Sequence, residues 1–158
     1  MLVLREVVTA AAGPDSGSLT LPFERRSMSR QRAELDSGEE VALLLPRGAV
    51  LRGGTVLRGD DGRTVVVHAA PEELSVAKST NLLLLARVAY HLGNRHVPVQ
   101  IAEGRLAYLR DHVLDDMVQG FGITVTTETA PFEPESGAYG EGAHGPDSAH
   151  PSSRGPDY

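Results

Sequence analysis

The chain has 158 residues, which is enough for one ordinary domain or two small ones. Its net charge is −6, and this acidic balance argues against a surface that adheres to nucleic acid or to anionic membranes. Cysteine is absent, which excludes disulfides, thiolate metal sites and cysteine nucleophiles.

Residues 1–71 are expected to form a small all-β domain. Short apolar runs rich in β-branched residues are separated here by clusters of Gly, Pro and Asp. The runs cover residues 2–4 with 7–8, 41–45, 55–57 and 64–67. Strands at this spacing predict a small antiparallel sandwich or an open barrel. The first run is too short for a signal peptide and is followed by Arg5 and Glu6, so we expect a cytoplasmic protein.

Residues 72–132 change character and predict a ferredoxin-like domain with the order β-α-β-β-α-β. Strand-like runs cover residues 74–78, 97–101, 106–109 and 123–127. One helix is expected to begin after Thr80 or Asn81 and to end at Gly93. A second helix is expected to begin at Asp111 and to end at Gly120. The predicted fold class is therefore α+β.

Residues 133–158 are expected to form a disordered, flexible C-terminal tail. Pro, Gly, Ser, Glu and His dominate this stretch and no apolar periodicity survives, so burial cannot offset the entropy of ordering the chain. The tail carries His144 and His150, two side chains that could bind metal weakly.

The main candidate for chemistry is His96, which follows Gly93 and is expected to begin a strand. Alternate residues Val97, Val99 and Ile101 are expected to face the core, which leaves His96 on the opposite face beside a chain reversal. A lone histidine near a strand is more often a capping or partly buried residue than a ligand. In a twofold dimer, however, one histidine per subunit becomes two ligands on the axis. Two imidazoles leave coordination positions open, which suits a carrier that must release its ion.

His112 is a secondary ligand candidate in the first turn of the second helix. Asp115 and Asp116 are expected to share its exposed face, and a histidine with a carboxylate one turn away could hold a divalent ion loosely. The alternative is that the aspartates stabilise the positive start of the helix. His91 is interpreted as structural, because a cationic ring suits the negative end of the first helix.

A basic run covers residues 24–32 and contains no aromatic residue. A nucleic-acid site would need stacking residues and a basic total charge, and both are missing. The run is therefore interpreted as a solvated turn, and the alternative is a docking patch for an acidic protein.

Three motifs resemble the UreE urease accessory family. They are AYHLGNRHVPVQI at residues 89–101, DHVLDDM at residues 111–117 and APFEPESGAYG at residues 130–140, and the similarity extends to LLLPRG at residues 43–48. The resemblance implies a cytoplasmic nickel chaperone that delivers Ni²⁺ to apo-urease. It also implies a homodimer with a peptide-binding-like N-terminal β domain and a ferredoxin-like metal-binding domain.

The same resemblance implies roles for individual residues and partners. The histidine that matches His96 binds nickel at the dimer interface, and the residue that matches His112 contributes to a peripheral site in some members. Some members carry a second histidine where this chain has Arg110, a cation that disfavours metal nearby. The implied partners are the urease apoprotein and the urease accessory proteins, including the accessory GTPase UreG. Zn²⁺ or Cu²⁺ can compete for the same kind of site, because raw affinity of nitrogen and oxygen ligands favours Cu²⁺ over Ni²⁺.

Two other classes of function stay open. A metal-dependent hydrolase needs a general base beside a metal-bound water, and no carboxylate lies at motif spacing from His96. A protein-interaction module would use the β domain to bind peptides, with metal binding incidental. The interpretation adopted is a metal carrier, not an enzyme.

Overall fold

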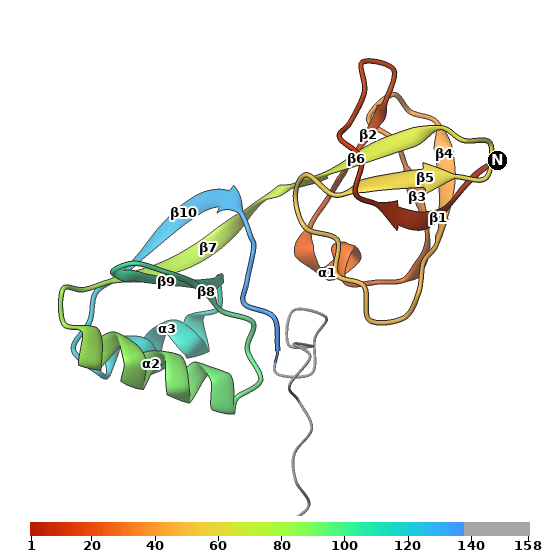
Figure 1. Ribbon diagram of the computed structural model, residues 1–158. Coiled ribbons are helices and arrows are strands. Elements are labelled where there is room, and N and C mark those ends of the chain that lie inside the picture. Colours follow the sequence, from red (N-terminus) through yellow and green to blue (C-terminus); the bar gives the residue numbers. More distant parts are fainter. Residues whose placement is uncertain (138–158) are drawn as a thin grey trace, which may run out of the picture.

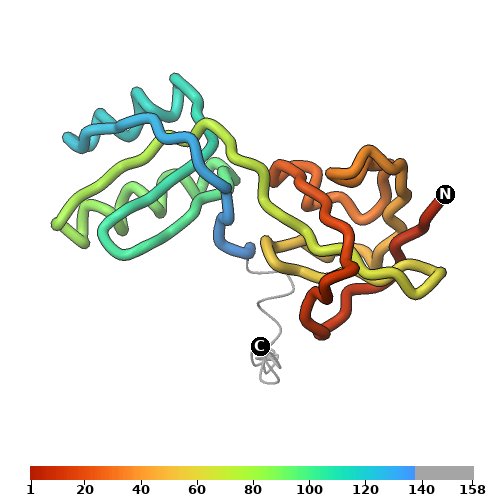
Figure 2. Tube along the Cα trace, turned by 90° about the horizontal axis from the view of Figure 1, so that it is seen from above, coloured from red at the N-terminus to blue at the C-terminus, as the bar shows by residue number. Residues whose placement is uncertain are grey.

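The computed structural model describes residues 1–137 and folds them into two domains, each built on its own sheet (Figures 1 and 2). The N-terminal domain contains a six-stranded sheet with the order β2-β6-β5-β1-β4-β3. Its elements are β1 (Leu2–Val8), β2 (Gly17–Leu21), α1 (Phe23–Arg26), β3 (Arg30–Glu34), β4 (Glu40–Leu44), β5 (Val56–Gly59) and β6 (Thr64–Ala69).

The apolar runs predicted as strands are confirmed as β1, β4, β5 and β6, whereas β2 and β3 were not expected. The expectation of an antiparallel sheet was only partly correct: β1–β5, β5–β6 and β3–β4 are antiparallel, but β1 pairs with β4 and β2 pairs with β6 in parallel. Parallel neighbours cannot be joined by a tight hairpin, and the chain makes β2, α1 and β3 before it returns beside β1. The sheet encloses an aliphatic core in which Leu4, Leu19, Leu43, Leu57 and Val67 are fully buried.

The second domain has the predicted ferredoxin-like order and confirms the α+β fold class. Its sheet has the order β10-β7-β9-β8, and all of its neighbouring strands are antiparallel. The elements are β7 (Pro71–Lys78), α2 (Leu82–Asn94), β8 (Gln100–Ala102), β9 (Arg105–Leu109), α3 (His112–Gln119) and β10 (Val125–Pro131). Both helices cover the same face of this sheet (Figure 1).

The helix starts predicted from capping residues are confirmed. The Asn81 side chain accepts a hydrogen bond from the backbone N–H of Leu84 at 3.1 Å. The Asp111 carboxylate accepts from the backbone N–H groups of Val113 and Leu114 at 2.9 and 3.1 Å. Each cap satisfies donors that the first turn of a helix leaves without partners.

The opposite face of the ferredoxin-like sheet is covered by aromatic residues rather than helices. Phe132 is fully buried there with Leu74, Val76 and Ala107. The ring of Phe23, from α1 of the N-terminal domain, packs edge-on against Phe132 with centroids 5.6 Å apart. The two domains therefore share a small apolar contact.

Only Ala70 separates β6 from β7, so nearly continuous extended chain joins the domains (Figure 1). After β10 the chain passes between the domains in both views (Figures 1 and 2). The flexible tail was predicted from residue 133, and residues 133–137 are placed. The rest of that prediction, with His144 and His150, lies outside the described residues. Among residues 1–137, no helix combines the length and apolar character needed to cross a membrane.

Candidate functional site

His96 lies in the turn that follows α2 and does not begin a strand. Helix α2 continues through Gly93 to Asn94, and β8 begins only at Gln100, so both the expected helix end and the expected strand start were wrong. The His96 N–H donates to the Gly93 carbonyl at 2.9 Å, and the next N–H donates to the Leu92 carbonyl at 3.2 Å. These two bonds form the Schellman pattern, which satisfies the last carbonyls of a helix.

The backbone of His96 adopts the left-handed conformation, with φ of +57°. Among residues 1–137 it is the one non-glycine residue with a positive φ. This conformation costs an L-residue roughly 1–2 kcal/mol, which is why glycine usually occupies the position. Strained residues of this kind cluster at functional sites, so the placement makes His96 a candidate for function.

Packing explains why the helix passes Gly93 before it ends. Leu92 is fully buried in the core beneath the helices, and Val97 packs against the same core. The Schellman pattern brings these two positions together, so their apolar contact sets the end of the helix. The residue between them that must turn with a positive φ is then His96, not Gly93.

The expected apolar face of this segment is only partly correct. Val99 is buried and Val97 is half-buried, but Ile101 is 50% exposed. Strict alternation does not apply before Gln100, where the strand begins, and β8 is an edge strand whose outer surface stays open.

The side chain of His96 is exposed at a groove of about 650 Å³. The groove combines apolar residues from the turn and from α1 with residues of the C-terminal segment. It is lined by Phe23, Ala89, Gly93, His96, Val97, Pro98, Val99, Ile101, Glu135, Ser136 and Gly137. An imidazole here is accessible to a metal ion and to a second protein surface.

An apolar stripe on the outer face of α2 leads to this turn. Leu82, Leu83 and Tyr90 are 69%, 70% and 65% exposed. Helical spacing places exposed Ala86 between the two leucines and Tyr90, and Gly93 continues the row. Large exposed apolar surfaces rimmed by polar residues mark interaction sites, so the stripe indicates a protein partner at the His96 end of the domain.

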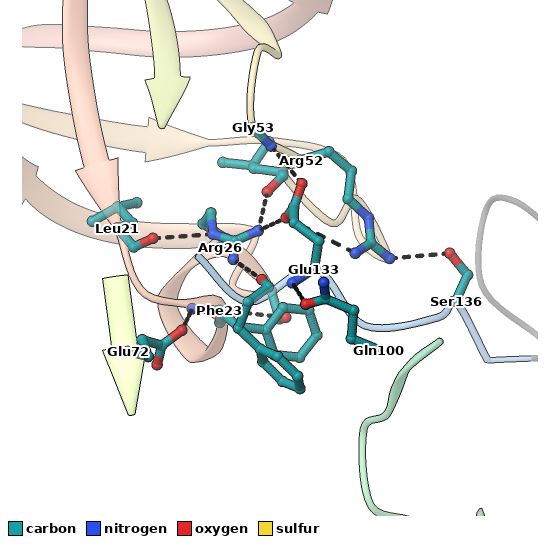
Figure 3. Close-up of polar contacts among 12 residues, drawn as sticks. Leu21, Phe23, Arg26, Arg52, Gly53, Glu72, Gln100, Glu133 and Ser136 are labelled. Atoms are coloured by element: carbon teal, nitrogen blue, oxygen red, sulfur yellow. Dashed lines mark hydrogen bonds and ion pairs between the residues drawn. The ribbon is translucent and has the colours of Figure 1, made fainter. Parts of the chain in front are cut away.

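A polar junction, drawn in Figure 3, holds the C-terminal segment, whose residues 135–137 line the same groove as His96. Its centre is Arg26, which is fully buried. The interpretation of residues 24–32 as a solvated turn was therefore wrong at Arg26, and residues 30–32 belong to strand β3. The Arg26 guanidinium donates to the carbonyls of Leu21 at 3.0 Å and Leu51 at 3.1 Å, both in the N-terminal domain. It also donates to the Phe132 carbonyl and to the Glu133 carboxylate.

The same segment is bonded to the ferredoxin-like domain. The Glu133 N–H donates to the Gln100 side-chain oxygen at 2.9 Å (Figure 3), and the Glu135 N–H donates to the Val99 carbonyl at 2.7 Å. The Glu133 carboxylate accepts from the Gly53 N–H at 3.1 Å. The chain after β10 therefore connects the N-terminal domain to the segment that follows His96.

His112 is exposed in the first turn of α3, as expected, and lines a separate pocket of about 570 Å³. Two carboxylates at this pocket are already engaged: Glu73 pairs with Arg110 at 3.6 Å, and Glu72 accepts from the backbone N–H of Phe23 at 3.1 Å. The guanidinium of Arg110 places a positive charge at the pocket. The secondary site therefore offers a metal ion one histidine, since Glu72 and Glu73 already have hydrogen-bond or ion-pair partners.

The expectation that Asp115 shares the exposed face of His112 was wrong. Asp115 is half-buried and accepts a hydrogen bond from the Tyr108 hydroxyl at 2.7 Å. Burial, together with the Asp115 carboxylate, raises the pKa of Tyr108 well above its usual range. The pair ties α3 to β9, which makes Asp115 a structural residue, whereas Asp116 is exposed.

The remaining histidines of the described chain do not line the groove of His96. His91 packs against Phe121 with ring centroids 5.1 Å apart, and His68 is exposed on β6. Within residues 1–137, no three His, Asp or Glu side chains gather closely enough to hold a metal ion. Sequence reasoning missed the junction formed by Arg26 and Glu133, since no local pattern distinguishes Arg26 from the arginines around it.

The fold and the site define a class of protein: a small β domain joined to a ferredoxin-like domain that presents an exposed histidine in a strained turn. Residues 4–70 match the family described as UreE urease accessory protein, N-terminal domain, and residues 72–157 match its C-terminal domain. The chain therefore belongs to the UreE urease accessory protein family.

Individual relatives agree with this assignment. The urease accessory protein UreE of Alkalilimnicola ehrlichii is 56% identical over 89% of this chain and 85% of its own length. The protein of the same name from Enterobacter sp. (strain 638) is 53% identical over 84% of this chain and 88% of its own. The urease accessory protein UreE of Pseudomonas putida (strain GB-1) is 53% identical over 82% of this chain and 79% of its own length.

Proposed function

We propose that this protein is a cytoplasmic nickel metallochaperone that holds Ni²⁺ between two copies of the chain and delivers it for assembly of the urease metallocentre. The observation that carries the proposal is His96, an exposed imidazole kept in a left-handed turn that glycine would occupy at lower cost. Membership of the urease accessory family supports a role in urease maturation.

Homodimerisation is supported by the apolar stripe of α2. Leu83, Ala86 and Tyr90 give an exposed surface that a second copy can bury, and an isologous contact places the same patch on both sides of a twofold axis. The proposal places the twofold axis at the Tyr90 end of the stripe, where such a contact brings the two His96 imidazoles near the axis. No set of three ligands exists within residues 1–137, so a shared site fits the ligands available.

The chemistry of the two His96 side chains, one from each chain, suits transport of a metal ion. Two neutral imidazole nitrogens bind a divalent ion and leave positions for water or for ligands of the receiving protein. We propose the urease apoprotein and the accessory GTPase UreG as those recipients, and a carrier rather than an enzyme as the role. Cu²⁺ and Zn²⁺ compete for such ligands, so the choice of nickel depends on geometry and supply. His112, His144 and His150 are proposed as secondary ligands.

Calorimetric titration of Ni²⁺ into the protein and into His96→Ala tests the proposal. The wild-type chain should bind one tightly held ion per two chains, and His96→Ala should lose that binding while it keeps its fold. His91→Ala is the matched control, because it removes an exposed imidazole from the same end of α2 and should keep the site. Unchanged nickel affinity in His96→Ala would refute the assignment.

A further inference from the structure

A pocket in the N-terminal domain brings together two sequence motifs that the proposed nickel site does not use. It lies at the end of the β3–β4 pair where Arg30 faces Leu44. One wall comes from residues 27–30, within the basic run, and the other from residues 45–47, within the LLLPRG motif. The volume is about 680 Å³, which is within the range of sites that bind small molecules. The lining residues are Ser27, Met28, Ser29, Arg30, Leu45, Pro46 and Arg47.

The backbone holds the two walls of this pocket in place. The Leu45 N–H donates to the Ser29 carbonyl at 2.8 Å, which joins one wall to the other. Gly48, with φ of +84°, turns the chain directly after Arg47, in a conformation that residues with a side chain rarely adopt. The pocket is therefore largely preformed, and a preformed site lowers the entropic cost of binding.

The charge of the pocket is opposite to that of the chain. Arg30 and Arg47 contribute two guanidinium groups, and among the described residues no Asp or Glu lines the pocket. Within residues 1–137, neither of these arginines forms an ion pair. The whole chain nevertheless has a net charge of −6. Two cations without carboxylate partners in one pocket favour an anion with about two negative charges.

The groups beside the two arginines also suit an anion. The Ser29 hydroxyl at the pocket can donate a hydrogen bond to it. The carbonyls at the end of α1, which would repel an anion, already accept hydrogen bonds. The Phe23 carbonyl accepts from the Ser27 hydroxyl at 3.0 Å, and the Arg25 carbonyl accepts from the Met28 N–H at 3.2 Å.

A phosphate monoester fits this lining better than a carboxylate does. It has a charge of about −1.5 to −2 at neutral pH and three acceptor oxygens, whereas a carboxylate has one charge. Arginine is the side chain that pairs with phosphate through two parallel hydrogen bonds. The 45% exposed Met28 and Pro46 add apolar surface to the same pocket, so the ligand is expected to carry an apolar part as well.

We propose that this pocket binds a small phosphorylated molecule, with the phosphate held by Arg30 and Arg47 and the apolar part against Met28. A nucleic acid is disfavoured, because no aromatic residue lines the pocket to stack on its bases. The proposal does not depend on nickel binding at His96, since the pocket belongs to the other domain.

Titration of phenyl phosphate into the full chain, followed by ¹⁵N–¹H NMR, tests the proposal. Shift changes should centre on the N–H groups of Ser29, Arg30 and Arg47. Phenyl sulfate has a similar shape but only one charge, and it should bind at least about fivefold more weakly. Inorganic phosphate, which lacks the ring, should also bind more weakly. Met28→Ser should weaken binding of phenyl phosphate but not of inorganic phosphate.

Arg30→Gln/Arg47→Gln should weaken binding of phenyl phosphate by at least about tenfold. The matched control is Arg5→Gln/Lys78→Gln, which makes the same change in net charge at two other exposed positions outside any ion pair in residues 1–137. It should bind within about twofold of wild type. All four side chains are exposed, and unchanged spectra of the ferredoxin-like domain should show that both variants fold.

Four results would overturn the proposal. They are the absence of saturable shifts up to about 20 mM phenyl phosphate, equal affinity for phenyl sulfate, equal loss in the charge-matched control, and shifts that centre on another part of the chain. Tighter binding of a single-stranded oligothymidylate at the same residues would also overturn it, because that result would make the pocket a nucleic-acid site.

Discussion

Replacement of His96 by glycine tests whether this residue is kept for metal binding although its backbone conformation costs stability. The left-handed backbone of His96 costs roughly 1–2 kcal/mol, and glycine removes this cost. Glycine also has more conformational freedom in the unfolded chain, which reduces the gain in stability by about 0.5–1 kcal/mol. We therefore expect His96→Gly to stabilise the ferredoxin-like domain by about 0.5–1 kcal/mol, or roughly 2–6 °C in Tm, while it abolishes the proposed nickel site.

Urea and thermal unfolding of His96→Gly, His96→Ala and His91→Gly measure this effect. His91 lies within α2, where the same change to glycine should cost about 0.5–1 kcal/mol, so the two glycine variants should move in opposite directions. His96→Ala keeps the left-handed strain and should be less stable than His96→Gly. Equal destabilisation by both glycine substitutions would show that the turn is not left-handed at residue 96 and that the residue is not retained at a cost.

Three further changes test contacts that position the site. Arg26→Met should destabilise the chain by about 3–5 kcal/mol in urea unfolding, since it removes the guanidinium that bonds three carbonyls and the Glu133 carboxylate. Faster amide exchange at Glu135 should accompany this change, and a loss below about 1 kcal/mol would contradict the role of the junction. Tyr108→Phe should cost about 1–2 kcal/mol by the same measurement, because Asp115 loses its hydroxyl donor, and a neutral effect would count against that contact. Hydrogen bonds from the hydroxyls of Ser18 and Thr20 lower the pKa of the Asp36 carboxyl. The Asp36 carboxylate therefore stabilises the fold above its unfolded-state pKa of about 3.9, and this stabilisation is lost as pH falls through the lowered folded-state pKa. Asp36→Asn should therefore cost about 0.5 kcal/mol near pH 7, and this difference should shrink below about pH 4; a pH-independent difference would exclude the carboxylate as its source.

The ferredoxin-like domain was predictable because its local signals agree with each other. Asn81 and Asp111 cap the two helices as their positions before apolar periodic runs indicate. The two central strands, β7 and β9, carry consecutive buried residues that mark them as strands. The N-terminal domain was harder, because β2 has only Leu19 and Leu21 as large apolar residues and β3 has only Ala33 facing the core. An edge strand needs few buried side chains, so its sequence resembles a polar turn.

Residues near the site were mispredicted where distant contacts decide the local structure. Arg26 is buried by Phe132 and Glu133, which lie 106 and 107 residues further along the chain. In the His96 turn, Gly93 is the residue that local rules select for a positive φ. The contact of Leu92 with the core and the packing of Val97 beside it move that requirement to His96. The candidate ligand was identified from the sequence, but its strained backbone was not.

Subunit mixing tests the shared nickel site most directly. Wild-type and His96→Ala chains are mixed, allowed to exchange, loaded with Ni²⁺ and examined by native mass spectrometry, which separates the two homodimers from the heterodimer. A shared site predicts one nickel ion on the wild-type dimer and none on either the heterodimer or the His96→Ala dimer at the same free nickel concentration. Full nickel occupancy of the heterodimer, or a wild-type chain that binds nickel as a monomer, would contradict the account.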